Sequence, residues 1–309
     1  MLPIHFAPLQ GHTDDVYRRI HHAIVGGIER YYTPFVRVEA GGIRSKDRRD
    51  IEPKNNKGIP ITPQLIFSNR NELEYLTNEM ETLGYQSIDL NMGCPFPLQA
   101  RHGRGSGLLV HTDIIAEVAE FIQTRPQLTF SVKMRLGWES SQEWIPALDI
   151  LNDCPLSHIT IHPRLGMQQY KGTIDNEAFE CFYEACKHPI IYNGDLTTLD
   201  QLHEIEERYP RLAALMIGRG LLARPSLATE YIEGREWSHE EHIHILRTLH
   251  SKLMEQYGNI VKGESQLHSK MRSYWEYTEP IIGHKPYKKI MKSGNLKNYL
   301  AAVQDLPRR

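Results

Sequence analysis

The chain has 309 residues, of which 24% are charged and 40% hydrophobic, and this ordinary globular composition excludes a disordered or fibrous protein. The 36 lysines and arginines nearly balance the 38 aspartates and glutamates, so the net charge is −2 and a nucleic-acid partner would need a local basic patch. No segment approaches the roughly 20 apolar residues of a membrane helix, and no basic stretch precedes an apolar run near the first residue, so we expect a cytoplasmic protein without membrane contact.

The cysteine pattern excludes two further classes of protein. Cys94, Cys154, Cys181 and Cys186 show neither the C-x-x-C spacing of zinc sites nor the density of a disulfide framework. We therefore expect reduced thiols and no metal site. The length suits one large α/β domain followed by a smaller one, and a monomer is expected.

Short β-rich runs recur along residues 1–218 at a spacing that suits a strand followed by a helix. Eight strands are predicted, at 4–9, 31–38, 61–68, 87–91, 129–136, 158–162, 189–193 and 214–218. Helical patterns lie between most of them, and the polar, glycine-bearing stretch 40–57 is predicted to be an elaborated loop. Eight alternating units in about 220 residues favour a (β/α)₈ TIM barrel of the α/β class over an open doubly wound sheet.

The pattern becomes helical after residue 234. Ser238 and Glu241 form a capping-box signature, and apolar residues then recur at helical spacing from 243 to 257. No strand pattern follows. We therefore predict two domains, a catalytic barrel over residues 1–234 and a small helical bundle over residues 235–309.

The predicted helical domain is locally basic. Residues 262–297 contain eight lysines and arginines against three glutamates, and Tyr274, Trp275, Tyr277 and Tyr287 lie among them. Cationic and aromatic side chains together bind phosphates and stack on the bases of structured RNA. The same residues would also suit a solvated helix face and the core of the bundle.

Residues 87–95 read SIDLNMGCP, a short strand pattern that ends with Cys94 between Gly93 and Pro95. The glycine lets the backbone turn and the proline removes a ladder hydrogen bond, so we expect the thiol to project from a strand end into a loop. An unpaired cysteine is more often buried as a small hydrophobe. The flanking residues, together with Asn91, favour a chemical role here.

Polar residues follow nearly every predicted strand, at the carboxyl ends where TIM barrels carry their active sites. The ends of the seventh and eighth strands, NGD at 193–195 and GRG at 218–220, suit phosphate binding through loop amides and an arginine. The glycines would also suit tight turns. Lys133 and Gln64, at two other strand ends, suit the ring nitrogens and carbonyls of an aromatic cofactor, so the combination suggests FMN.

Residues 103–107, GRGSG, are similar to a dinucleotide-binding loop but lack the preceding strand and the later acidic residue of the Rossmann fingerprint. We therefore reject that interpretation. The run is instead expected to be a mobile glycine-rich loop, with Arg101 and Arg104 in contact with a polyanionic substrate.

Taken together, these motifs resemble the tRNA-dihydrouridine synthases, FMN enzymes that reduce a uridine base in tRNA. The resemblance spans nearly the whole chain and preserves the order and spacing of the motifs. It rests on APLQG at 7–11, TPFVRV at 33–38, DLNMGCP at 89–95, SVKMRLGW at 131–138, IHPR at 161–164, NGD at 193–195 and IGRG at 217–220. The helical, basic tail resembles the part that the family uses, with the barrel, to grip tRNA.

The resemblance implies roles for the residues that match the family's motifs. It places FMN against Pro8, Leu9, Gln10, Gln64, Lys133, His162, Asn193, Gly194, Asp195, Gly218 and Arg219. It places Asn91 beside the target base, and Arg37, Tyr170, Lys270 and Arg272 match positions where relatives meet RNA. NADPH or NADH is expected to reduce the flavin and then to leave.

The resemblance also implies the role of Cys94. Reduced FMN would deliver a hydride to C6 of uracil, and Cys94 would protonate C5. A free cysteine has a pKa of roughly 8.5, so near neutral pH it is mostly protonated and still acidic enough to donate. Lys133 and His162 are candidates to steady the oxygens of uracil or flavin.

The chain departs from the family pattern at three places. Leu9 replaces a frequent methionine, a change that preserves volume. Residues 96–99, FPLQ, lack the lysine that relatives carry soon after Cys-Pro, so one RNA phosphate contact is expected to be lost or moved to Arg101. Pro163 replaces the glycine after the histidine of the sixth strand, and it stiffens that turn.

Two alternatives to this function stay open at this point. An FMN barrel that acts on a free small molecule, like a dihydroorotate dehydrogenase or an ene-reductase, would share the flavin residues and would need no basic tail. A non-catalytic RNA-binding protein on a barrel scaffold would keep the tail and would not take up FMN.

Overall fold

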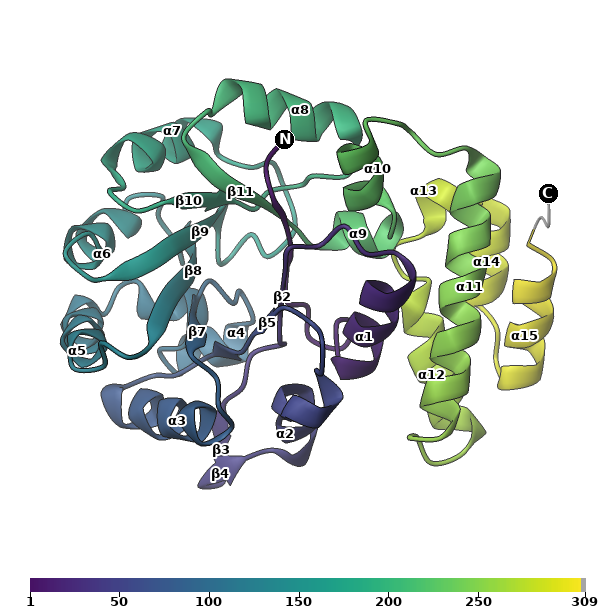
Figure 1. Cartoon of the computed structure of the whole chain (residues 1–309), viewed down its shortest axis with the longest axis horizontal. Coiled ribbons are helices and arrows are strands. Elements are labelled where there is room, and N and C mark those ends of the chain that lie inside the picture. Colours follow the sequence, from purple (N-terminus) through teal and green to yellow (C-terminus); the bar gives the residue numbers. More distant parts are fainter. Residues whose placement is uncertain (307–309) are drawn as a thin grey trace.

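Within residues 1–306, which this computed structural model describes, nine parallel strands form one sheet that curls into a barrel (Figure 1). In chain order they are β1 Ile4–Phe6, β2 Arg30–Tyr32, β5 Ile61–Thr62, β6 Gln64–Leu65, β7 Ser87–Met92, β8 Thr129–Gly137, β9 Leu156–Leu165, β10 Ile190–Tyr192 and β11 Leu212–Ile217. Their order in the sheet is β5-β2-β1-β11-β10-β9-β8-β7-β6.

The two ends of this sheet are halves of one interrupted strand. Only Pro63 separates β5 from β6, yet β5 pairs with β2 and β6 pairs with β7. Proline has no N–H to donate, so the ladder breaks there, while the Pro63 carbonyl still accepts from Asp89 N at 2.9 Å. An isolated parallel bridge pairs Val36, which follows β2, with Leu65 of β6, so the second strand position contacts both halves of the interrupted strand. The eight strand positions therefore close, which confirms the predicted TIM-barrel fold.

Successive residues of β7 face two different environments. Ile88, Leu90 and Met92 are fully buried in the main apolar core. Asp89 and Asn91, the residues between them, make hydrogen bonds to side chains of the neighbouring strands β6 and β8. This alternation places polar groups on the inner face of the barrel, close to the strand end that carries Cys94.

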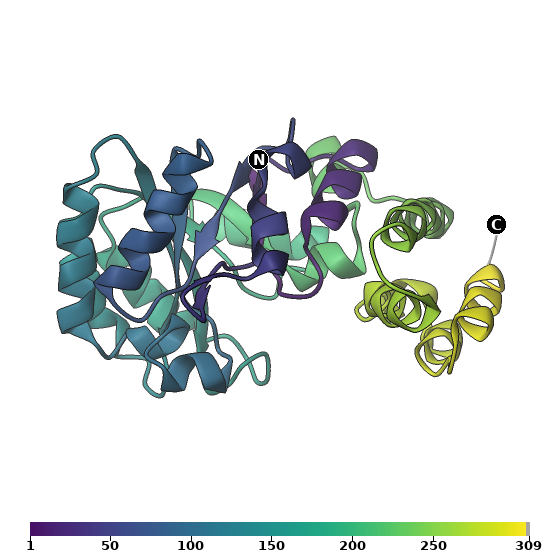
Figure 2. The same ribbon diagram turned by 90° about the horizontal axis from the view of Figure 1, so that it is seen from below.

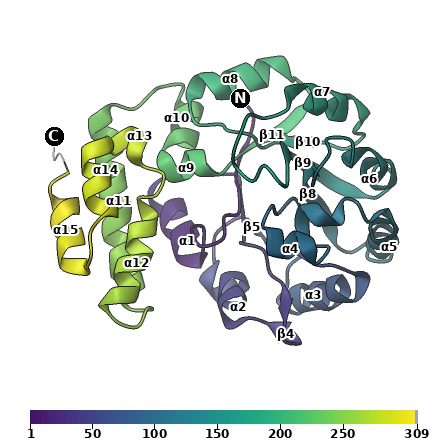
Figure 3. The same ribbon diagram turned by 180° about the vertical axis from the view of Figure 1, so that it is seen from behind.

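Helices follow most strands and surround the barrel (Figure 1). They are α1 Asp15–Ile24, α3 Arg70–Thr82, α5 Thr112–Gln123, α6 Trp144–Leu151, α7 Asn176–Ala185, α8 Leu199–Arg208 and α10 Leu227–Glu233. Two shorter helices, α4 Pro97–Arg101 and α9 Arg219–Ala223, follow the carboxyl ends of β7 and β11 and lie on the near side of the barrel in Figure 3.

The connection after β2 is more ordered than the predicted loop. It contains a hairpin of β3 Val38–Glu39 and β4 Gly42–Ile43, the helix α2 Ser45–Ile51, and the 3₁₀ turn η1 Pro53–Asn55. The sequence showed only its polarity and glycines, because helices this short carry little periodicity.

Within residues 235–306, five helices stand at one side of the barrel (Figure 2). They are α11 His239–Gly258, α12 Glu264–Tyr274, α13 Glu279–Ile282, α14 His284–Met291 and α15 Leu296–Gln304. The predicted capping box begins α11, since Ser238 Oγ accepts from Glu241 N at 3.2 Å and Glu241 Oε2 accepts from Ser238 N at 2.7 Å. No helix of the described chain is both long and apolar enough to span a membrane. The division into two domains at residue 234 stays a prediction.

The helical region contacts the barrel through the start of α1. Tyr257 OH on α11 donates to Asp14 Oδ1 at 2.6 Å. Lys270 Nζ on α12 lies 2.9 Å from Asp14 Oδ2 and donates to Gly11 O at 2.8 Å. Asp14 also caps α1 by accepting from Tyr17 N at 3.1 Å. The loop between β1 and α1 is therefore held by both parts of the chain.

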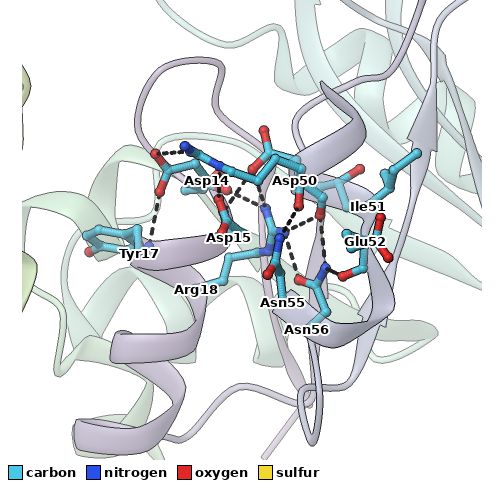
Figure 4. A network of polar contacts seen from close by, with 12 residues as sticks. Asp14, Asp15, Tyr17, Arg18, Asp50, Ile51, Glu52, Asn55 and Asn56 are labelled. Carbon is cyan, nitrogen blue, oxygen red and sulfur yellow. Dashed lines mark hydrogen bonds and ion pairs between the residues drawn. The ribbon is translucent and has the colours of Figure 1, made fainter. Parts of the chain in front are cut away.

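A buried polar network fixes the same end of α1 (Figure 4). Arg18 donates to Thr13 O and Asp50 O, each at 2.7 Å, and to Asn56 Oδ1 at 2.9 Å. Asp15 N donates to Asp50 Oδ1 at 2.8 Å. A fully buried guanidinium is tolerated because a carboxylate lies beside it and most of its donors are occupied. These bonds attach α1 to the segment that contains α2 and η1.

Candidate active site

A cavity of about 1010 Å³ lies at the carboxyl ends of the barrel strands, at the upper end of the range for small-molecule sites. Among the residues predicted for the site, it is lined by Pro8, Leu9, Gln10, Arg37, Gln64, Asn91, Cys94, Lys133, His162, Tyr170, Asn193, Asp195, Gly218 and Arg219. Gly194, Lys270 and Arg272 do not line it. Within residues 1–306, no group of three or more His, Cys, Asp or Glu side chains is placed to hold a metal ion.

Cys94 follows β7, and its backbone is held on both sides. Its N–H donates to Asn91 Oδ1 at 2.8 Å, and its carbonyl accepts from Ser106 Oγ at 2.8 Å. Gly105 has a φ of +59° and packs so closely that a Cβ there would lie 2.7 Å from Cys94 Cβ. No larger residue fits at that position. The free thiol therefore lines the cavity from a fixed backbone.

The protonation state of Cys94 decides which chemistry it can perform. Burial raises the pKa of Cys94 above its usual value, although a backbone hydrogen bond at Phe96 and the charges of Arg135 and Lys133 act in the opposite direction. The thiol is therefore protonated at neutral pH. A protonated thiol suits a general acid, whereas a nucleophile or a metal ligand would need the thiolate.

The glycine-rich run after Cys94 is packed rather than mobile. Gly105–Leu108 form a buried 3₁₀ turn, η2. Arg104 donates to both carboxylate oxygens of Glu72. Arg101 is exposed, and in the described part of the chain it has no ion-pair partner. The glycines thus serve close packing against Cys94, and Arg101 is the more accessible of the two arginines for a polyanionic substrate.

Lys133 lines the cavity from β8, in register with Asn91 of β7. Burial lowers the pKa of Lys133 to about 8, and the nearby charge of Arg135 acts in the same direction. Among residues 1–306, the Lys133 ammonium has neither a hydrogen-bond nor an ion-pair partner. A half-buried cation without an internal partner suits a ligand that brings an acceptor into the cavity.

His162 lines the cavity from β9 as a neutral ring. Burial, and then the positive charges of Arg135 and Lys133, hold the pKa of His162 well below its usual value. Arg164 Nη1 lies 3.1 Å from His162 Nε2. A guanidinium can only donate, so Nε2 accepts and the proton of the ring is assigned to Nδ1. His162 can therefore donate to a ligand through Nδ1 without a change of charge.

Two arginines bind the carboxylate of Asp195, which follows β10. Arg164 Nη1 donates to Asp195 Oδ1 at 2.9 Å and Arg164 Nη2 to Oδ2, while Arg219 Nη2 donates to Oδ1 at 2.7 Å. Burial alone would raise the pKa of Asp195, but these hydrogen bonds and charges hold it below its usual value. Two cations on one anion leave a net positive charge, which suits an anionic group such as a phosphate.

The loops after β10 and β11 pack tightly against each other. Asn193 Nδ2 donates to Met216 O at 2.7 Å. A Cβ on Gly220 would lie 2.0 Å from a backbone oxygen, and a Cβ on Gly194 would lie 2.9 Å from the Tyr192 hydroxyl. Close packing alone therefore requires glycine at 220. The same packing explains why Gly194 is buried beneath the cavity wall rather than on it.

Tyr170 covers part of the cavity with a ring that is 47% exposed. The guanidinium carbon of Arg219 lies 4.6 Å from the ring centroid, and that of Arg135 lies 5.4 Å from it. The rings of Tyr170 and His162 are 6.3 Å apart. An exposed aromatic ring held by two cations suits stacking on a nucleobase.

The other residues expected to meet RNA have different surroundings. Arg37 lines the cavity and pairs with Glu39 at 2.9 Å. Lys270 pairs with Asp14, as described above, and so joins the helical region to the barrel. Arg272 is half-buried, and no residue of the described chain forms a hydrogen bond or ion pair with its guanidinium. The RNA contacts of all three stay predictions.

The four aromatic residues of the basic tail fall into two groups. Trp275 is fully buried and donates from Nε1 to Tyr299 OH at 2.8 Å. Tyr274 is buried and donates to a backbone carbonyl of α11 at 2.9 Å. Both belong to the core of the helical region and cannot stack on RNA. Tyr277 and Tyr287 are half-buried, and Tyr277 lines the cavity.

Arg135, Arg164 and Tyr277 line the cavity but are not among the residues to which the resemblance gave a role. Arg135 and Arg164 line the cavity two positions after Lys133 and His162. Both were predicted to lie at strand ends, and alternate residues of a strand face the same side, so they share the cavity face with Lys133 and His162. Tyr277 reaches the cavity from the helical region. No local pattern signals that contact, because it depends on how the helices dock on the barrel.

Solved structures share the barrel fold. The structure resembles the old yellow enzyme from Trypanosoma cruzi with a TM-score of 0.54 at 11% identity, over 76% of this chain and 89% of that one. It resembles a 2-naphthoyl-CoA reductase complex with a TM-score of 0.55 at 11% identity, over 75% of this chain and 50% of that one. Such distant likeness shows the fold alone.

Sequence comparisons go further than the fold. The tRNA-dihydrouridine(16) synthase of Aquipseudomonas alcaligenes is 29% identical over 237 residues, which are 74% of this chain and 75% of that protein. The tRNA-dihydrouridine(16) synthase of Neisseria meningitidis serogroup B is 28% identical over 232 residues, 72% of this chain and 69% of that protein. The family model for dihydrouridine synthase (Dus) matches residues 5–307. The chain therefore belongs to the dihydrouridine synthase family.

Proposed function

We propose that the protein is a tRNA-dihydrouridine synthase, an oxidoreductase that uses FMN and NADPH or NADH to reduce the C5=C6 bond of a uridine in tRNA. Membership of the family and the names of its curated relatives support this activity. The observation that carries the proposal is the protonated thiol of Cys94, fixed in a cavity whose walls carry the unpaired ammonium of Lys133 and the neutral ring of His162.

The donors of the cavity fit a flavin mononucleotide. Lys133 and Gln64 offer donors to ring carbonyls and nitrogens, and the Lys133 ammonium has no internal partner to give up. Arg219, with the Arg164–Asp195 pair beside it, supplies the positive charge that a phosphate needs. The remaining residues proposed to hold the cofactor are Pro8, Leu9, Gln10, His162, Asn193, Gly194 and Gly218.

The side chains around Cys94 suit the protonation half of the reaction. When bound, reduced FMN supplies a hydride to C6 of the uracil ring. Cys94 then donates its proton to C5, where negative charge develops. The charges of Arg135, Lys133 and Arg37 stabilise the thiolate that remains, because they favour ionisation of Cys94. The Lys133 ammonium and His162 Nδ1 can donate hydrogen bonds to the ring oxygens of uracil or flavin.

The residues that line the cavity support a polymeric substrate. Tyr277 and Pro280 of the helical region line the same cavity as Cys94, so an RNA on the basic helices would reach the thiol directly. The names of the relatives make position 16 of tRNA the first position to examine. The protein is proposed to act as a monomer, and a tRNA substrate supports action in the cytoplasm.

The experiment that tests this function uses the full-length protein loaded with FMN. It is incubated with NADPH, or with NADH in parallel, and with tRNA from cells that lack this gene, and mass spectrometry then maps dihydrouridine along each tRNA. We expect a yellow protein and dihydrouridine at a defined position. Equal rates on free uridine or orotate would instead indicate a small-molecule reductase. A colourless protein that cannot take up FMN would indicate a non-catalytic RNA-binding protein.

A further inference from the structure

Behind the cavity lies a chain of buried hydrogen bonds that ends on Cys94. It starts at Asp89 on β7, which is fully buried and does not line the cavity. Gln64 Nε2 donates to Asp89 Oδ2 at 2.7 Å, and Ser131 Oγ donates to Asp89 Oδ1 at 2.6 Å. Asn91 Nδ2 donates to Gln64 Oε1 at 2.7 Å. Cys94 N donates to Asn91 Oδ1 at 2.8 Å, which completes the chain.

The register of the strands holds this series of hydrogen bonds in place. Gln64 of β6 is the register partner of Asp89, and Asp89 is the register partner of Ser131 of β8. Asn91 lies two residues after Asp89, on the same face of β7. All four side chains therefore come from three adjacent barrel strands rather than from loops. Groups on rigid elements are positioned before any ligand binds.

The Asp89 carboxylate, at the start of this series of hydrogen bonds, determines the orientation of the two side-chain amides. A side-chain amide has a donor end and an acceptor end, and half a turn exchanges them at little steric cost. A carboxylate only accepts, so Asp89 requires the NH₂ group of Gln64. The oxygen of Gln64 then requires the NH₂ group of Asn91. The oxygen of Asn91 is left for the backbone N–H groups of Gly93, at 3.1 Å, and Cys94.

We propose that Asp89 is a positioning residue that sets the polarity of the Gln64 and Asn91 amides and, through them, the geometry of Cys94 and the donor character of the cavity floor. Each amide keeps one N–H after its internal bonds are counted. Rings rich in carbonyl oxygens, such as flavin and uracil, match those donors. This choice of ligand rests on the function proposed above. The effect on Cys94 rests on the geometry alone.

Reversal of the amides would disturb the loop that carries the thiol. The NH₂ group of Asn91 would then face the N–H groups of Gly93 and Cys94, donor against donor, at the distances now occupied by hydrogen bonds. A buried donor without an acceptor is costly, so the loop after β7 would have to move. Cys94 would move with it.

The variant Asp89→Asn tests the proposal, because it keeps the shape of the side chain and replaces an acceptor-only group with one that can turn round. Ser131→Ala is the matched control, since it removes a hydrogen bond to Asp89 and keeps the carboxylate that accepts from Gln64. All assays are run well above pH 6, because burial raises the pKa of Asp89 to about 6 and the Ser131 hydrogen bond acts in the opposite direction. The rate at which iodoacetamide alkylates Cys94 is measured in flavin-free, full-length protein. The visible spectrum of bound FMN and the kinetics of tRNA reduction are measured in the loaded protein.

We expect Asp89→Asn to change the alkylation rate of Cys94 and the spectrum of bound FMN. The kcat for tRNA reduction should fall about 100-fold, because the reacting groups are misplaced. The KM for tRNA should stay near its original value, because the predicted RNA contacts Lys270 and Arg272 lie outside the cavity and are unchanged in this variant. Ser131→Ala should keep the alkylation rate and the spectrum, and its kcat should stay within about fivefold of the original.

A transposed pair, Asp89→Asn together with Gln64→Glu, separates the two halves of the proposal. The acceptor-only group then stands at position 64, where it accepts from Asn91 and from the amide introduced at position 89. Asn91 keeps its direction, so the alkylation rate of Cys94 should return towards its original value. The donor at position 64 is lost, so FMN binding should be weaker than in the original protein.

Two results would overturn the proposal. One is an Asp89→Asn protein with the alkylation rate, FMN spectrum and turnover of Ser131→Ala. The other is a transposed pair that folds and does not restore the alkylation rate. If Asp89→Asn alone does not fold, the transposed pair carries the test. The alkylation assay uses neither flavin nor tRNA, so a protein that never reduces tRNA would refute the proposed function and leave this result unaffected.

Discussion

Lys270 on α12 and Asp14 at the start of α1 form an ion pair, with 2.9 Å between Nζ and Oδ2. The Asp14 side chain is only 4% exposed and also accepts from Tyr257 OH at 2.6 Å. Burial alone would raise the pKa of Asp14, but the charge of Lys270 and the Tyr257 hydrogen bond hold it below its usual value. The pair fastens the helical region to the loop that carries Leu9 and Gln10 of the cavity.

Replacement of Lys270 by alanine should lower the free energy of unfolding by about 2 kcal/mol, because a buried carboxylate loses a charged hydrogen-bond partner. Urea unfolding of Lys270→Ala measures this change. Lys288→Ala is the control, since the Lys288 side chain is exposed and has no ion pair within the described residues. Equal stability of the two variants would show that the pair does not hold the two parts together.

Arg272 is expected to contact a tRNA phosphate. Arg272→Ala should weaken tRNA binding and reduce the slope of log Kd against log salt by about 1, because each phosphate contact releases a counterion. Binding titrations at several salt concentrations measure the slope. The control is Arg125→Ala, because Arg125 precedes β8 at the opposite end of the barrel and pairs with Glu81. An unchanged slope for Arg272→Ala would place Arg272 outside the interface.

The kcat for tRNA reduction should fall at alkaline pH, because Lys133 loses its proton there. Burial lowers its pKa to about 8, so the charged donor is lost as pH rises through that value and kcat should fall. Arginine stays protonated throughout the assayed pH range, so the rate of Lys133→Arg should not show this alkaline fall, even if the rate itself is lower. Rates from about pH 6 to about pH 10 define both profiles. The same alkaline fall in rate in both proteins would assign the ionisation to another group, with Cys94 as the next candidate.

Two histidines and a tyrosine form a cluster at the amino end of the barrel. His5 Nδ1 lies 3.1 Å from Tyr32 OH, which lies 3.2 Å from His158 Nε2. Burial lowers the pKa of His5 to about 3 and that of His158 to about 4. The unfolded chain, with histidine near pH ~6.5, binds more protons than the folded one in the window between these values. The stability of the protein should therefore fall as the pH falls from about 6.5 to about 4.

Thermal unfolding across that window tests the cluster. His158→Asn should unfold with a weaker dependence on pH than the original protein, because one histidine of this cluster no longer takes up a proton on unfolding. His239→Asn, at an exposed position at the start of α11, should keep the original dependence. The same dependence in both variants would contradict the assignment to His158.

The barrel and most of its cavity were predictable because they follow from local patterns. Cys94 ends a strand in which apolar residues at 88, 90 and 92 alternate with polar ones, and the turn residues Gly93 and Pro95 follow at once. The carboxyl ends of parallel strands meet on one side of a barrel, so residues as distant as Pro8 and Arg219 could be assigned to one site.

What the sequence could not show depends on packing between distant segments. The predicted strand 61–68 breaks at Pro63, and the barrel uses that break as the point where the sheet closes. The Asp14–Lys270 pair has no local signature, because it depends on how α12 docks. The basic tail could not distinguish Trp275, which is core, from Tyr277, which lines the cavity, since both follow the same helix.

The role of Cys94 as the general acid is the central claim. Single-turnover reactions with reduced, FMN-loaded protein and tRNA measure dihydrouridine formation in the original protein, in Cys94→Ala and in the control Cys181→Ala, which changes an exposed thiol. We expect Cys94→Ala to bind FMN as the original protein does and to form dihydrouridine about 10²–10⁴-fold more slowly, with Cys181→Ala unaffected. Undiminished dihydrouridine formation by Cys94→Ala would contradict this role.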